Sequence, residues 1–160
     1  MNKMPEVTRI LYASDVQPGA RPAFRQAVSL CGHYQSQITF LHVVEPVSGA
    51  AERLVKTMMK EDASLQALHD ESIKQVWAQV EERVHRFCRE ELCAEDMLDA
   101  GTLQVLIREG TPWKTILQVA DEMDANLIVV GARHPNSLLG HTPSRVVQSS
   151  KRPVLVVPLG

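Results

Sequence analysis

The 160-residue chain has no surplus of basic residues, because 19 aspartates and glutamates balance its 17 lysines and arginines. Aromatic residues are also scarce, at 4% of the chain, and they are not interleaved with basic ones. Domains that bind nucleic acid usually carry a basic patch or stripe. The composition therefore predicts no nucleic-acid partner.

Long apolar runs and targeting signals are lacking as well. No stretch approaches the ~20 apolar residues of a membrane-spanning helix, and residues 1–9 lack the apolar centre of a signal peptide. The three cysteines, Cys31, Cys88 and Cys93, form no C-x-x-C pair. These absences predict a cytoplasmic protein without a membrane partner, in which the cysteines are free thiols.

Short apolar runs alternate along the chain with segments of helical periodicity. Strands are predicted at residues 9–13, 38–44, 103–107, 126–130 and 153–157. Helices are predicted at about residues 20–33, from residue 51 or 58 to residue 93, and after Thr111 and Thr142, where a threonine cap precedes a proline. This alternation predicts a single α/β domain over residues 1–160, with a parallel sheet and helices on both of its faces.

The predicted long helix carries one apolar stripe. Its members recur at intervals of three and four residues and are Ile73, Val76, Val80, Val84 and Phe87. This spacing is typical of an amphipathic helix that packs on a sheet. The alternative is a helix that offers a groove to a protein partner.

Five sequence pieces, in order, resemble the universal stress protein family over nearly the whole chain. They are ILYASD at residues 10–15, LHVVEP at 41–46, EGTP at 109–112, ANLIVVG at 125–131 and RPVLVVP at 152–158. The resemblance implies a Rossmann-like fold of the adenine-nucleotide alpha hydrolase type, with a five-stranded parallel sheet in the order 3-2-1-4-5. It also implies a homodimer joined by antiparallel pairing of the last strands. An apolar edge strand would otherwise be exposed to water, and the expected interface residues are Val154, Leu155, Val156 and Val157.

The resemblance also implies where a nucleotide would bind. In the sheet order 3-2-1-4-5, ligands bind beyond the carboxyl ends of strands one and four. ATP-binding members of the family place an aspartate after strand one and a valine at the end of strand two near the base and sugar, and a G-x2-G-x9-G-[S/T] loop around the phosphates. The candidate residues here are Ala13, Asp15, Val43, Val44, Gly131, Arg133, Gly140, Thr142 and Ser144.

The phosphate loop departs from the family pattern. His134 takes the place of the second glycine, and Pro135 after it has no amide to donate. Only five residues separate His134 from Gly140, and His141 replaces the serine or threonine. A shorter loop with fewer free amides suits a triphosphate poorly, so the chain resembles the family branch that does not bind ATP.

Two other kinds of ligand, an anion or AMP and a metal ion, are alternatives for this loop. Thr142 and Ser144, with Arg133 and Arg145, could hold an anion or AMP at the start of a helix; alternatively, Thr142 only caps that helix and the arginines are solvated. His134 and His141, together with Asp15, could bind a metal ion. Their separation of seven residues is no recognised ligand spacing, so no metal site is predicted.

No catalytic motif is present: the chain has no G-x-S-x-G elbow, no Walker lysine and no S-G-G-x-D-S loop. We therefore predict a stress-response homodimer that is not an enzyme, needs no cofactor and acts through contacts with unidentified protein partners. The alternative is a nucleotide switch or slow ATPase that binds ATP or AMP with Mg²⁺.

Overall fold

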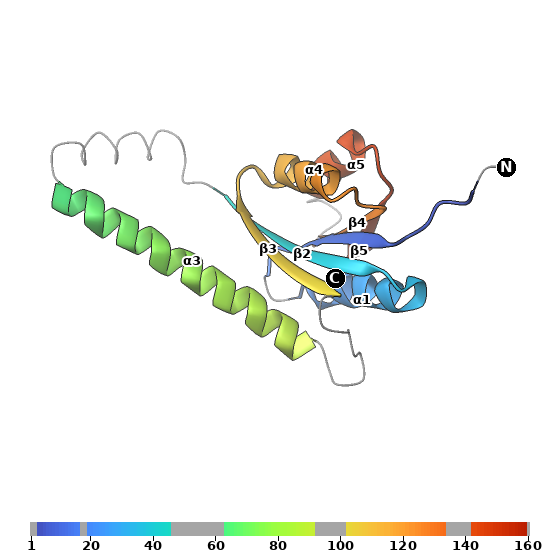
Figure 1. Cartoon of the computed structure of the whole chain (residues 1–160), viewed down its shortest axis with the longest axis horizontal. Helices are drawn as coiled ribbons and strands as arrows, with labels where there is room; N and C mark the ends of the chain where they lie inside the picture. Colours follow the sequence, from blue (N-terminus) through green and yellow to red (C-terminus); the bar gives the residue numbers. More distant parts are fainter. Residues whose placement is uncertain (1–2, 17–18, 46–62, 92–101, 134–141, 160) are drawn as a thin grey trace.

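The computed structural model describes residues 3–16, 19–45, 63–91, 102–133 and 142–159. They form a parallel sheet in the order β3-β2-β1-β4-β5, with helices on both faces (Figure 1), as expected. The strands are β1 Arg9–Ala13, β2 Gln37–Val44, β3 Leu103–Glu109, β4 Leu127–Ala132 and β5 Val154–Pro158. The helices are α1 Arg21–Tyr34, α3 Ala63–Glu91, α4 Pro112–Glu122 and α5 Thr142–Ser149.

The predicted boundaries hold to within one or two residues for most elements. β3 and β4 each continue two residues beyond their predicted ends, and β5 starts and ends one residue later than predicted. The long helix is described only as Ala63–Glu91, so its predicted start at residue 51 or 58 and its predicted end at residue 93 lie outside the described residues.

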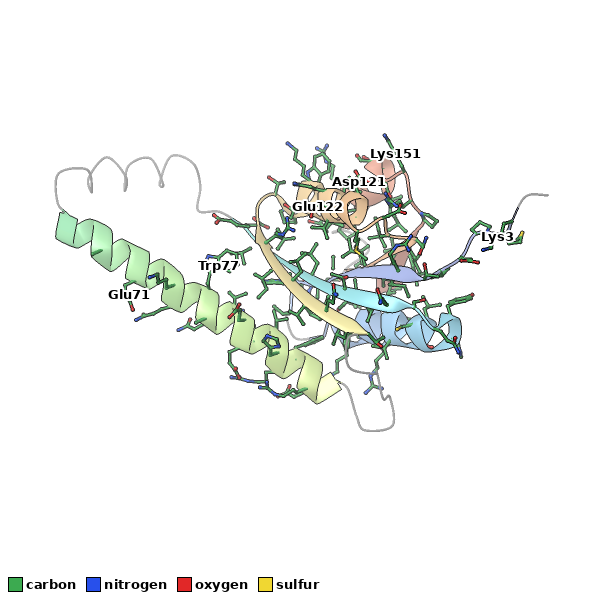
Figure 2. The ribbon with its side chains drawn as sticks, in the orientation of Figure 1. Lys3, Glu71, Trp77, Asp121, Glu122 and Lys151 are labelled. Atoms are coloured by element: carbon green, nitrogen blue, oxygen red, sulfur yellow. The ribbon has the colours of Figure 1, made fainter. Side chains whose placement is uncertain are left out.

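Two apolar cores lie on opposite faces of the sheet, because successive strand side chains point to opposite sides. Ile10 and Tyr12 of β1 face α1 and α3, whereas Leu11 faces α4 and α5. All three side chains are buried. Figure 2 shows the two helix layers: α4, with Asp121 and Glu122, lies across the sheet from α3, with Glu71 and Trp77.

The few aromatic residues are concentrated in the core under α1 and α3. Tyr12, Phe24, Phe40 and Phe87 form one cluster, with ring centroids 5.2 Å apart for Tyr12–Phe40 and 5.5 Å apart for Phe24–Phe87. Edge-to-face rings at this spacing stabilise a core beyond the area that they bury. The cluster therefore ties β1, β2, α1 and α3 together.

The carboxyl-terminal half of α3 packs on the sheet as the apolar stripe predicted. Val84 is fully buried, and Val80 and Phe87 pack against the same core. The side chains of Ile73 and Val76 lie outside the described part of the chain. Among the described residues, no helix combines the length and the apolar character that a membrane span requires, although α3 has 29 residues.

The predicted start of α4 is confirmed, but without a side-chain cap, and the start of α5 differs from the prediction. Thr111 occupies the N-cap position of α4, but its side chain makes no cap hydrogen bond. Its carbonyl oxygen accepts a bond from the Thr115 amide at 2.9 Å, and Pro112, at the first helical position, has no amide to donate. α5 begins at Thr142 itself, one residue earlier than a threonine cap implies.

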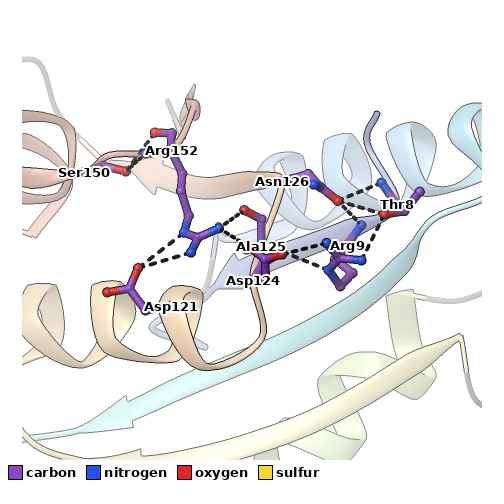
Figure 3. Close-up of polar contacts among 8 residues, drawn as sticks. All are labelled: Thr8, Arg9, Asp121, Asp124, Ala125, Asn126, Ser150 and Arg152. Atoms are coloured by element: carbon purple, nitrogen blue, oxygen red, sulfur yellow. Dashed lines mark hydrogen bonds and ion pairs between the residues drawn. The ribbon is translucent and has the colours of Figure 1, made fainter. Parts of the chain in front are cut away.

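Asn126 joins the amino ends of β1 and β4 (Figure 3). Its side-chain oxygen accepts hydrogen bonds from the Thr8 amide at 2.9 Å, the Thr8 hydroxyl at 2.9 Å and the Arg9 amide at 2.8 Å. The backbone amide of Asn126 in turn donates to the Arg9 carbonyl at 2.8 Å. One side chain thus fixes where β1 enters the sheet.

Arg152 continues this network toward β5. Its guanidinium donates to Asp124 Oδ1 at 2.9 Å and to the Ala125 carbonyl at 2.7 Å (Figure 3). Arg9 contacts the other oxygen of Asp124 at 3.2 Å. The hydrogen bond from Arg152 and the charges of both guanidinium groups hold the pKa of Asp124 below its usual value, so the carboxylate stays ionised at neutral pH.

We expect Asn126→Ala to lower the free energy of unfolding by about 1–3 kcal/mol, because three donors lose their common acceptor. Asn126→Asp places a carboxylate oxygen where the amide oxygen was, so the three donors keep an acceptor. Its loss of stability is expected to be clearly smaller. Urea denaturation of both variants measures the difference. An equal loss in both would mean that the shared acceptor does not hold β1 in register.

Candidate functional site

A cavity lies where the carboxyl ends of the central strands meet. β1 pairs with both neighbours there, Ala13 with Leu41 of β2 and with Val130 of β4. The connections that follow β1 and β4 lead to helices on opposite faces of the sheet, which opens a crevice at this edge. The cavity measures about 640 Å³, within the ~300–1,000 Å³ usual for ligand pockets.

The structure brings most of the predicted site residues to this cavity. Those that line it are Ala13, Asp15, Val43, Val44, Gly131, Arg133 and Thr142. Ser144, in the first turn of α5, is half-buried but is not among the lining residues. Gly140, with His134, Pro135 and His141, lies outside the described residues.

Asp15 and Arg133 form a bidentate ion pair across the crevice. Arg133 Nε donates to Asp15 Oδ2 at 2.7 Å, and Nη2 donates to Oδ1 at 2.8 Å. The two side chains are 49% and 33% exposed, respectively. The hydrogen bond from the guanidinium to Asp15 raises the pKa of Arg133, so its positive charge is permanent. Both predicted ligand residues are therefore engaged with each other.

The turn before α1 accommodates the Arg133 guanidinium. A β-carbon added at Gly19 would lie 3.4 Å from Arg133 Nη1. Gly19 also has a φ of 90°, a backbone conformation that residues with a side chain rarely adopt. Glycine at this position is therefore required by the turn, whereas a β-carbon would only make an ordinary contact with the arginine.

Gly131 faces an apolar side chain. A β-carbon added there would lie 2.5 Å from Leu159 Cδ1 and 2.9 Å from Leu159 Cγ. Leu159 follows β5 and is held by a hydrogen bond from its amide to the Ala132 carbonyl at 2.8 Å. Gly131 was predicted to let backbone approach a phosphate; in the structure the absence of its side chain makes room for Leu159.

His42 is a lining residue that the sequence analysis did not single out. Its Nδ1 lies 2.8 Å from the Ser14 carbonyl oxygen. Since a carbonyl only accepts hydrogen bonds, Nδ1 is the donor in this contact. The alternation of strand side chains places His42 on the same face as Phe40, because the two are two residues apart. This pattern could have predicted that His42 points toward the packed side of the sheet.

The starts of α4 and α5 flank the cavity on the face of the sheet opposite to α1 and α3. Pro112 of α4 and Thr142 of α5 line it. The Arg145 guanidinium carbon lies 5.7 Å from the centre of the Trp113 ring, and Lys114 Nζ lies 5.5 Å from it. Arg145, predicted as a possible anion ligand, therefore makes a cation–π contact.

Comparison with known proteins identifies the family to which this scaffold belongs. The sequence profile of the Universal stress protein family matches residues 6–158. The chain belongs to the universal stress protein family. The Rossmann-like α/β fold with the sheet order 3-2-1-4-5, which the sequence resemblance implied, is confirmed.

Individual relatives of this universal stress protein are distant. Universal stress protein Sll1654 of Synechocystis is 29% identical over 153 residues, which are 93% of this chain and 84% of the relative. Universal stress protein G of Salmonella typhimurium is 33% identical over 63 residues, and the match spans only 44% of its length. The solved structure of universal stress protein UspA from Lactobacillus plantarum has a TM-score of 0.61 at 26% identity, covering 95% of this chain and 98% of that one.

We expect Gly131→Ala to destabilise the fold by about 1–3 kcal/mol, because the added methyl group overlaps Leu159. The double variant, which carries both Gly131→Ala and Leu159→Ala, has no such overlap. Its loss of stability should therefore be smaller than the sum of the losses in the two single variants. Urea denaturation of the four proteins gives this coupling. Additive losses would show that Leu159 does not occupy the space beside Gly131.

Proposed function

We propose that this universal stress protein is a cytoplasmic, homodimeric stress-response regulator that acts through protein contacts and binds ATP weakly or not at all. The observation that carries the proposal is that two predicted ligand residues of the crevice are already engaged by other residues of the chain. Asp15 is paired with Arg133, and Gly131 is covered by Leu159. Two residues that would contact a nucleotide in an ATP-binding member are thus engaged within the chain. No catalytic role is proposed.

The sequence of the phosphate loop supports the same proposal. His134 and His141 replace a glycine and a hydroxyl residue, and Pro135 removes a donor. A triphosphate needs several amides that point toward it. Both oxygens of Asp15 already accept a hydrogen bond from Arg133, so a ligand would share or compete for them.

A second candidate function is favoured by the size of the cavity. A volume of about 640 Å³ is enough for a nucleotide, and Asp15, Val43 and Gly131 stand where the family resemblance places the nucleotide. A small phosphorylated ligand such as AMP, or ATP with Mg²⁺, would then act as a switch or undergo slow hydrolysis.

The proposed dimer is supported by the edge strand β5. Val154, Leu155 and Val156 are only half-buried within one chain. Along a parallel strand, successive residues direct their backbone hydrogen-bonding groups to opposite edges. Pro153 and Leu159 bond to β4, so the amides of Val154 and Val156, which alternate with them, lie on the outer edge. Two such edges in antiparallel pairing would bury the exposed apolar surface.

Isothermal titration with ATP and Mg²⁺ tests the leading proposal. We expect no micromolar binding to the purified protein, because Asp15 is paired with Arg133 and Leu159 lies against Gly131. A micromolar dissociation constant for ATP would replace the leading proposal with the nucleotide switch.

The dimer has a separate test in two proline variants. Val156→Pro removes an outward amide of β5 and should give a folded monomer, because edge strands tolerate proline but lose pairing there. Val105→Pro is the matched control, because Val105 is a half-buried valine with an outward amide on the other edge strand, β3. This substitution should leave the dimer intact. Light scattering after size exclusion measures the mass, and circular dichroism checks the fold. A dimeric Val156→Pro protein would place the interface elsewhere.

A further inference from the structure

We propose that Arg133 is the anion-binding group of the crevice, for ligands with a phosphate monoester, and that Asp15 is an internal competitor that occupies it. The proposal deepens the second candidate function, on which it rests. It reverses the role that the family resemblance gives to Asp15, since the carboxylate opposes the ligand instead of holding it.

The geometry of the ion pair is the first support. Nε and Nη2 of Arg133 donate in parallel to the two oxygens of Asp15, at 2.7 and 2.8 Å. A phosphate presents two oxygens to a guanidinium in the same forked arrangement. The arginine is therefore already oriented for a phosphate, and the carboxylate fills the position of two phosphate oxygens.

The surroundings of the pair are the second support. Arg133 lies in the wall of the cavity and is 33% exposed, so an anion in the cavity can reach its fork. Thr142, the first residue of α5, lines the same cavity. Its hydroxyl adds a donor of the kind that a phosphate accepts from.

Relative charge decides which partner Arg133 takes. A phosphate monoester carries nearly two negative charges at neutral pH, whereas the Asp15 carboxylate carries one. The pair is also partly exposed, so solvent screens its charges and a ligand can compete for the arginine. A phosphorylated ligand can therefore displace Asp15, but a neutral nucleoside has no group that competes for the arginine.

Two substitutions should consequently act in opposite directions. Asp15→Asn keeps the size of the side chain, removes its charge and weakens its hold on Arg133, so affinity for phosphate ligands should rise about three- to tenfold. Arg133→Gln removes the forked donor and should lower that affinity below detection. If Asp15 holds the nucleotide directly, both substitutions weaken binding.

Calorimetric titration with inorganic phosphate, AMP and adenosine, at constant ionic strength, provides the test. The gain in Asp15→Asn should appear for phosphate and AMP but not for adenosine. Glu45→Gln is the matched control, because Glu45 is another carboxylate in the cavity lining that shares the general charge effect; its gain should be clearly smaller. Equal gains in Asp15→Asn and Glu45→Gln would overturn the proposal, as would a gain for adenosine.

A nuclear magnetic resonance signal of Arg133 provides a readout that does not depend on affinity. Its Nε–H resonance, identified by its loss in Arg133→Gln, should shift in Asp15→Asn and should move toward a common phosphate-bound position in both wild type and Asp15→Asn. Thermal unfolding confirms that the variants are folded. Absence of phosphate and AMP binding in folded Asp15→Asn overturns the inference, and it leaves the proposed function through protein contacts in place.

Discussion

The position of β1 between β2 and β4 is the constraint on which the rest of the structure depends. Its parallel register brings Ala13 beside Leu41 on one side and Val130 on the other. The chain leaves β1 and β4 toward opposite faces of the sheet, so the residues after these strands face each other across the crevice. Asp15 and Arg133 consequently meet, although 118 residues separate them.

The same edge is used for packing as well as for the ion pair. β5 runs parallel to β4, so its end returns to the crevice and places Leu159 over Gly131. A charged ligand can compete for the partly exposed ion pair, whereas the apolar contact at Gly131 does not depend on the charge of a ligand. The crevice therefore has one contact that an anion can exchange and another that it cannot.

The sequence predicts the strands, the helices and most of the crevice, because apolar runs and turn residues act locally and the carboxyl ends of parallel strands share one edge. It does not predict which groups bind each other there. Asp15 and Arg133 were each expected to contact a ligand, and only the three-dimensional register shows that they contact one another. Leu159 was not expected at all, because it follows the last strand and its partner Gly131 has no side chain to suggest a contact.

If Arg133 is the anion-binding group of the crevice, as proposed, the crevice would select ligands by charge more than by shape. When Asp15 and Arg133 are paired, their charges cancel and each is already hydrogen-bonded, so a neutral ligand gains little by separating them. A ligand with two negative charges gains the whole guanidinium fork. Leu159 links this selection to the edge of the sheet, because it continues β5 directly, and Val157 of the same strand is buried in the core. Displacing Leu159 would therefore disturb the packing of β5, whereas exchanging the partner of Arg133 would not. On the proposed assignment of Arg133, an anion that contacts only this arginine would bind with the least change to the rest of the fold.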